Sequence, residues 1–114
     1  MSRRSRRRGP GRGGSRRTIV ITSVGPTGVV NSPTPTIRAI VEDRYGVLLF
    51  EDDIDVYLDG QPMRFDFAES SGRLTCPTGG LSSGTHAVEI EAIIETNYGS
   101  RTARKRWTFT VARR

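Results

Sequence analysis

The stretch DIDVYLDG, residues 53–60, decides the fold of this chain. Three branched aliphatic residues, Ile54, Val56 and Leu58, alternate in it with acidic residues and one tyrosine. Successive side chains of a β-strand point to opposite faces, so this pattern places the aliphatic face in a core and the acidic face in water. The Asp-Gly pair that closes the stretch is among the strongest signals for a tight turn between antiparallel strands. The stretch therefore predicts a strand that leads into a hairpin.

The same alternation recurs along the chain after Thr18, and the spacing of apolar residues gives almost no support to a helix. Glycine, proline and asparagine mark the turns between the alternating segments. The predicted strands cover residues 18–24, 37–42, 53–59, 63–67, 73–76, 86–95 and 106–111. Seven strands at roughly ten-residue spacing predict an all-β, antiparallel, immunoglobulin-like sandwich, of which fibronectin type III domains are one variant.

The core is expected between the inward faces of these strands. Alternation in the segment 86–95 places the single histidine on the same face as its aliphatic residues, and the last strand turns two aromatic side chains inward. The predicted core residues are Leu58, His86, Val88, Ile90, Trp107, Phe109 and Val111. About twenty inward side chains in all, each contributing on the order of 1.5 to 3 kcal/mol before entropy is subtracted, can support a domain. No internal disulfide can assist, because Cys76 is the only cysteine.

Some apolar residues lie outside this inward pattern. The run Val47-Leu48-Leu49-Phe50 is too short for a helix, and we expect it to cover one end of the core. Four apolar residues fall on strand faces that should be wet, and they would mark a partner surface if they formed a contiguous patch. These four residues are Val20, Ile40, Tyr57 and Ile93.

The basic charge of the chain is concentrated in its first 17 residues. This segment holds eight arginines and no acid, whereas the remainder has ten basic and twelve acidic residues, a net charge of −2. It has no Val, Ile, Leu, Phe, Tyr or Trp, so burial cannot offset the entropy of ordering it. We predict a disordered tail at 1–17 and a sandwich at 18–114. The candidate contacts to nucleic acid, nonspecific and salt-dependent, are Arg3, Arg4, Arg6, Arg7, Arg8, Arg12, Arg16 and Arg17.

The chain has no long apolar segment. Its first residues lack the apolar region of a secretory signal, and no stretch approaches the roughly 20 apolar residues of a membrane span. We therefore expect a soluble chain without a signal peptide.

The sequence offers no catalytic constellation. Any Ser-His-Asp or Cys-His site would need His86, whose inward place at a strand start favours a structural bond to a buried carbonyl. Cys76 precedes a proline and has no basic or histidine neighbour in sequence, so it lacks the surroundings of an activated thiolate. One cysteine and one histidine cannot complete the four ligands of a zinc site. The chain is predicted to be neither an enzyme nor the holder of a cofactor.

Acidic residues around the start of the third predicted strand are the only metal candidates. Asp52, Asp53 and Asp55 could offer oxygen ligands to Ca²⁺. The run lacks the glycine and the spaced acids of a known calcium loop. Acids that alternate along a strand more commonly solvate its outer face and discourage edge pairing.

Several short motifs occur along the chain in a characteristic order and spacing. They are Pro26-x-Gly28, Pro35, Asp43 followed by Gly46, Leu58-Asp59-Gly60, Leu81-x-x-Gly84-x-His86-x-Val88 and Trp107-Thr108-Phe109-Thr110-Val111. In order and spacing they resemble bacterial immunoglobulin-like domains, which are repeated in cell-surface and secreted multidomain proteins. Fibronectin type III domains are the nearest alternative.

The resemblance implies a non-catalytic spacer or protein-binding (adhesion) module, at the cell surface or secreted, that contacts a protein partner or neighbouring domains as a monomer or weak oligomer. The chain departs from that family in its single copy and its missing signal peptide. The alternative hypothesis is a protein that associates with nucleic acid or an anionic surface through the arginine-rich tail.

Overall fold

The structure is a computed structural model that describes residues 19–96 and 99–112. The predicted tail, residues 1–17, lies outside the described residues, as do residues 18, 97, 98, 113 and 114.

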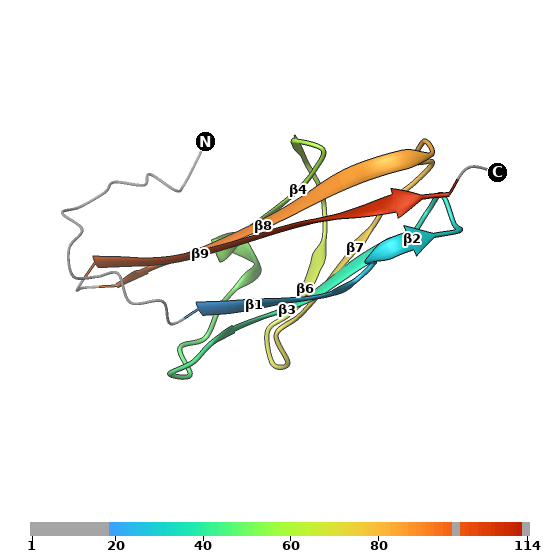
Figure 1. Ribbon diagram of the computed structural model, residues 1–114. Helices are drawn as coiled ribbons and strands as arrows, with labels where there is room; N and C mark the ends of the chain where they lie inside the picture. Colours follow the sequence, from blue (N-terminus) through green and yellow to red (C-terminus); the bar gives the residue numbers. More distant parts are fainter. Residues whose placement is uncertain (1–18, 97–98, 113–114) are drawn as a thin grey trace.

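Two β-sheets pack face to face (Figure 1). In the first sheet the strands follow the order β1 (Ile19–Gly25), β3 (Thr36–Asp43), β7 (Arg73–Pro77) and β6 (Asp66–Ala68). In the second sheet the order is β2 (Gly28–Val30), β9 (Gly99–Val111), β8 (Gly84–Thr96), β4 (Ile54–Leu58) and β5 (Gln61–Pro62). One 3-10 turn, η1 (Glu51–Asp53), precedes β4. This arrangement confirms the predicted all-β, immunoglobulin-like sandwich.

The strand count and one pairing differ from the prediction. The described residues form nine strands rather than seven, and β2 was not predicted. β2 pairs with β9 in parallel, with Gly28 opposite Phe109 and Val30 opposite Val111, so the sandwich is antiparallel except at this edge. The chain thus leaves the edge of the first sheet after β1 and joins the edge of the second at β2.

The predicted return strand over residues 63–67 is wrong. Only two residues after the Asp-Gly turn pair with β4, as Gln61 lies opposite Leu58 and Pro62 opposite Tyr57. Proline is tolerated in β5 because β5 is the edge strand of its sheet, and the missing N–H would face away from β4. After Met63 N donates to the carbonyl oxygen of Val56 (2.9 Å), the chain crosses to the other sheet and pairs there as β6 with β7.

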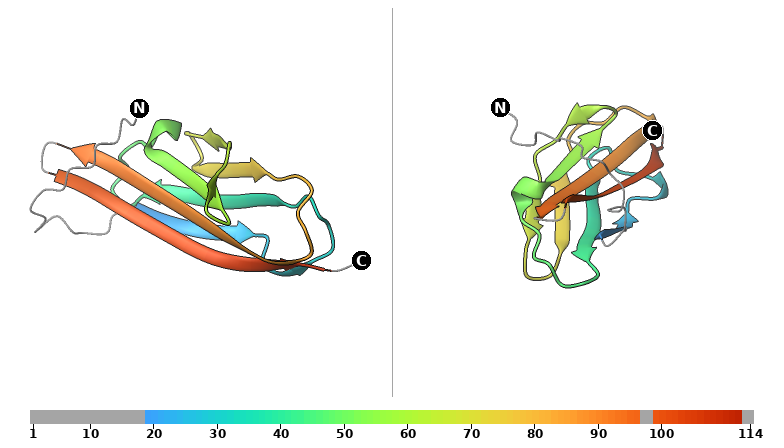
Figure 2. Two further views of the ribbon diagram at one scale, coloured as in Figure 1. Left: turned by 90° about the horizontal axis from the view of Figure 1, so that it is seen from above. Right: turned by 90° about the vertical axis from the view of Figure 1, so that its left-hand side faces the viewer.

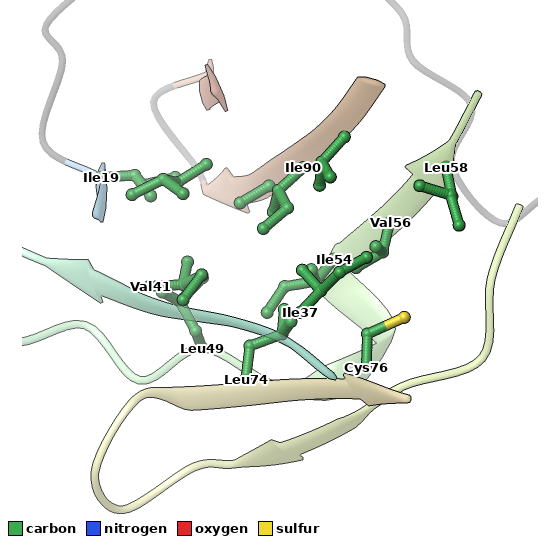
Figure 3. Close-up of a cluster of buried hydrophobic side chains, with 14 of the residues drawn as sticks. Ile19, Ile37, Val41, Leu49, Ile54, Val56, Leu58, Leu74, Cys76 and Ile90 are labelled. Atoms are coloured by element: carbon green, nitrogen blue, oxygen red, sulfur yellow. The ribbon is translucent and has the colours of Figure 1, made fainter. Parts of the chain in front are cut away.

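The core fills the space between the sheets. Figure 3 shows Ile37, Leu74 and Cys76 from the first sheet directed toward Ile54, Val56 and Ile90 from the second. Of the seven predicted core residues, Leu58, His86, Val88, Ile90, Phe109 and Val111 are buried. Trp107 is half-buried against the core, and its Nε1 donates to the carbonyl oxygen of Pro26 (3.0 Å).

The β8–β9 hairpin is longer than the sandwich that it covers. Its register runs without a shift from Gly84 opposite Val111 to Thr96 opposite Gly99, whereas β4 stops pairing with β8 at Ala92. The end of the hairpin therefore extends past β4 (Figure 1). Within residues 19–96 and 99–112, no helix has the length and apolar character that a membrane span requires.

Candidate interaction surface

Residues 44–50 connect β3 to η1 and are held in place by the carboxylate that ends β3. Asp43 Oδ2 accepts hydrogen bonds from the backbone N–H groups of Tyr45 (3.0 Å) and Val47 (3.1 Å). The N–H of Gly46 donates to the carbonyl oxygen of Asp43 (3.0 Å), and Gly46 supplies the positive φ of 82° that this turn needs. A buried aspartate thus organises the loop from within.

The second half of the loop is anchored by one leucine. Leu49 is 4% exposed and packs into the core beside Val41 (Figure 3). Its neighbours Leu48 and Phe50 are 54% and 47% exposed, so the expected cover over the core is formed by Leu49 alone. The N–H of Phe50 donates to Asp53 Oδ2 (3.0 Å), which secures the end of the loop to η1. We call the exposed residues Tyr45, Val47, Leu48 and Phe50 the loop patch.

An open pocket of about 410 Å³ adjoins the loop patch. Its walls come from the loop, from η1 and from the projecting part of β8: Val47, Leu48, Phe50, Asp53, Ile93, Ile94 and Glu95. Five of these seven residues are apolar, and the other two, Asp53 and Glu95, carry carboxylates. Such a surface suits an apolar side chain that is flanked by a positive charge.

The four apolar residues that were considered as a patch do not form one. Val20 and Ile40 belong to the first sheet, whereas Tyr57 and Ile93 belong to the second. Ile93 is buried rather than wet, because the loop lies against it and shares the pocket. The alternation of β8 could not reveal this, since the cover comes from a segment outside the strand pattern.

His86 is held by two acceptors. Its Nδ1 lies 2.6 Å from Asp59 Oδ2 and its Nε2 lies 2.8 Å from the carbonyl oxygen of Ser82. The hydrogen bond to Asp59, followed by that to Ser82, raises the pKa of His86, and the bond to His86 lowers the pKa of Asp59. The ring also packs at a tilt on Phe109, with centroids 5.7 Å apart. With both nitrogens engaged, the imidazole joins the Asp-Gly turn to the segment before β8 and has no nitrogen left for a substrate.

The predicted partner of His86 was a carbonyl, and Ser82 provides one. The carboxylate of Asp59 was missed, although its Asp-Gly turn was recognised. Pairing of Leu58 with Val88 brings the turn beside His86, and that register could not be read from two separate alternating segments.

Cys76 is fully buried, and burial raises the pKa of its thiol to about 11. Its Sγ donates to the carbonyl oxygen of Arg64 (3.4 Å). The thiol is therefore a core group without nucleophilic character at neutral pH.

The calcium candidates do not converge. Asp53 binds the backbone of Phe50, while Asp55 lies on β4, opposite Glu91. Among the described residues, no group of three or more Asp, Glu, His or Cys side chains is placed to hold a metal ion.

Two clusters of basic residues bear on the binding of anions. The eight candidate arginines of the tail lie outside the described residues. On β9, Arg104 is paired with Glu89 (3.1 Å) and Glu91 (3.2 Å) of β8. Its charge is therefore partly neutralised within the sheet.

Comparison with known proteins supports the fold alone. No protein-family model and no curated protein sequence matches the chain. Its structure is similar to that of CopC from Methylosinus trichosporium OB3b, with a TM-score of 0.57 and 13% sequence identity over 81% of this chain and 93% of that one. The chain is therefore a β-sandwich protein of the immunoglobulin-like kind; its place among repeated surface domains remains a prediction.

Proposed function

We propose that this chain is a non-catalytic immunoglobulin-like module that binds a protein partner through the loop patch. The observation that carries the proposal is that Leu48 and Phe50 are exposed although the backbone around them is fixed by Asp43, Asp53 and the buried Leu49. An apolar surface that is ordered before binding loses little conformational entropy when a partner covers it.

The chemistry of the surroundings indicates the kind of partner. Asp53 and Glu95 line the pocket beside the apolar side chains, and Glu51 and Asp52 directly precede Asp53 in η1. A partner that inserts an apolar anchor and carries lysine or arginine beside it would complement both features. A spacer role, as the family resemblance implies, is compatible with this surface.

The test compares charged substitutions at two equally exposed sites. Leu48 and Val24 are both 54% exposed, but Val24 lies at the end of β1, away from the loop patch. A partner is captured with the wild-type chain from an extract of its source, identified, purified and measured by calorimetry. Leu48→Asp and Phe50→Asp should each weaken binding about tenfold or more, whereas Val24→Asp should not. Equal binding by all four proteins would contradict the proposal.

A second candidate function rests on the tail. Eight arginines without an acid in residues 1–17 would bind phosphates through counterion release, which supports association with nucleic acid or another polyanion. Retention on a duplex DNA column should fall steeply with salt and disappear when the eight arginines become serines. Exchange for lysines should preserve it, because counterion release depends on charge. Retention that survives the serine substitutions would count against this function.

A further inference from the structure

The second sheet has an edge that is only partly occupied. β2 pairs with β9 at residues 109–111, whereas β9 begins at Gly99. Among residues 19–96 and 99–112, no strand is paired with this side of β9 from residue 99 to residue 108. Figure 2, left, shows β9 along the border of the sheet.

The hydrogen bonds between β4, β8 and β9 show which backbone groups of β9 face this edge. Asp59 binds both backbone groups of Ala87, since Ala87 N donates to its Oδ1 and Asp59 N donates to the oxygen of Ala87. Ala87 therefore faces β4, and its neighbours face β9. On the far side of β9, Ala112 N donates to the oxygen of Val30.

Backbone groups alternate between the two sides of a strand, and the β8–β9 register has no shift. The even-numbered residues of β9 therefore face away from β8. Beyond β2, the N–H and C=O groups of Thr102, Arg104 and Arg106 and the N–H of Thr108 point toward the open edge, whereas the C=O of Thr108 faces Gly28 of β2. They form a ready template for one more strand.

The side chains along this edge are basic. β9 carries Arg101, Arg104, Lys105 and Arg106, and residues 99–112 contain no acid. Arg104 is paired with Glu89 and Glu91, whereas the other three form no ion pair with any described residue. The adjacent edge strand β1 has no ionisable side chain and exposes Val20 and Val24.

These charges decide which strand fits. Pairing with β9 of a second copy would set four basic side chains against four others, and like charges on neighbouring strands destabilise a sheet. The same charges favour an incoming strand whose side chains are acidic.

We propose that the open edge of β9 accepts an extended acidic segment of a partner protein as an added strand, bound by the backbone of Thr102–Thr108 and selected by Arg101, Lys105 and Arg106. This surface is separate from the loop patch, so an experiment can contradict the proposal for one surface and leave the proposal for the other unaffected.

The experiment uses the full chain and a capped peptide of about nine residues in which glutamate alternates with valine, a length that matches the open stretch. Amide hydrogen exchange is followed by NMR. In the free chain the amides of Ala103, Lys105 and Trp107 should exchange slowly and those of Thr102, Arg104 and Arg106 rapidly. The peptide should slow the second set.

Proline supplies a selective variant. The N–H of Thr102 faces the open edge, so Thr102→Pro removes a donor for the peptide and no bond to β8. It should weaken peptide binding about five- to tenfold, while Thr102→Val keeps the N–H and should bind like the wild type. Lys105→Glu combined with Arg106→Glu, which leaves the backbone donors in place, should weaken binding about tenfold or more.

The proposal would be overturned by slow exchange of the even-numbered amides in the free chain, by equal binding of the proline variant with its fold verified by circular dichroism, or by dimerisation through this edge. Peptide or oligonucleotide binding without amide protection would show a charge effect alone and would also overturn it. Leu48→Asp should leave peptide binding unchanged, which separates this test from that of the loop patch.

Discussion

His86 Nδ1 lies 2.6 Å from Asp59 Oδ2, across a gap of 27 residues in the sequence. The contact joins the tight turn after β4 to the first residues of β8. Because Nε2 also faces an acceptor, the carbonyl oxygen of Ser82, the protonated ring is the form that satisfies both neighbours. The pair therefore makes the stability of the sandwich depend on pH.

The stability that His86 adds should be confined to a window of pH. Its pKa is raised in the folded chain, so its contribution is complete below the ordinary value of 6.5 and is lost as pH rises through the folded value. The pKa of Asp59 is lowered, so its contribution is present above 3.8 and is lost as pH falls through the folded value. Urea unfolding of the wild type and His86→Gln should differ most between about pH 4 and 6.5. A difference that is constant from pH 5 to pH 9 would contradict this account.

Two substitutions of Asp59 should distinguish the contribution of its charge beside His86 from that of the hydrogen bond it accepts from the backbone of Ala87. Asp59 has a φ of 53°, and Oδ1 accepts the N–H of Ala87 (2.8 Å). Asparagine tolerates this conformation and keeps one acceptor, whereas alanine loses both bonds. At pH 6 we expect Asp59→Asn to lower the free energy of unfolding by about 1 kcal/mol and Asp59→Ala by about 2 to 3 kcal/mol. Equal losses in urea titrations would show that the backbone role is negligible.

Gly72 should tolerate no side chain. Its φ is 76°, and an added Cβ would lie 2.8 Å from the carbonyl oxygen of Val41. The Gly72 carbonyl also accepts the N–H of Val41 (2.8 Å), so the turn cannot move freely away. Gly72→Ala should cost about 2 to 3 kcal/mol. Gly79→Ala is the matched control, because nothing lies within 4 Å of a Cβ added at residue 79. This substitution should change the free energy of unfolding by less than about 0.5 kcal/mol. Thermal unfolding of the two variants tests the contrast.

Cys76 should be unreactive in the folded chain. With a pKa of about 11 and no exposed surface, the thiol is almost entirely protonated at pH 8. Alkylation by iodoacetamide should be at least about 100-fold slower than for an unhindered thiol. The rate should recover in concentrated urea, where burial is lost. Rapid alkylation without denaturant would mean that β7 opens readily.

Alternation was sufficient to predict the sandwich, because buried and exposed faces follow the period of a strand. In β8, Val88, Ile90, Ala92 and Ile94 are buried on one face as the pattern requires. The pattern failed where the chain passes from one sheet to the other, because alternation does not reveal which strand is the partner. Phe65 and Phe67 continue the alternation, but the bonds to β4 end at Met63, and Phe67 pairs with Leu74 of the other sheet.

The candidate surface was less predictable than the fold. Hydrophobicity alone cannot tell which member of Val47-Leu48-Leu49-Phe50 turns inward, because the choice depends on the bonds from Asp43 and Asp53. Ile93 looked exposed for a related reason, since its cover is a loop from elsewhere in the chain. The open edge of β9 follows from the shortness of β2. The three residues of β2, which follow a Gly-Pro turn, were too few to predict a strand.

The parallel pairing of β2 with β9 also determines how the sandwich would carry a load. β1 begins at one end of the sandwich and β9 finishes at the other (Figures 1 and 2). Tension along this axis pulls β2 and β9 in opposite directions along their length, so their hydrogen bonds are sheared together and not opened one after another. A module joined in series through its two ends would then resist extension at this seam. Val30→Pro, which removes an N–H from the seam, should lower the unfolding force in single-molecule pulling.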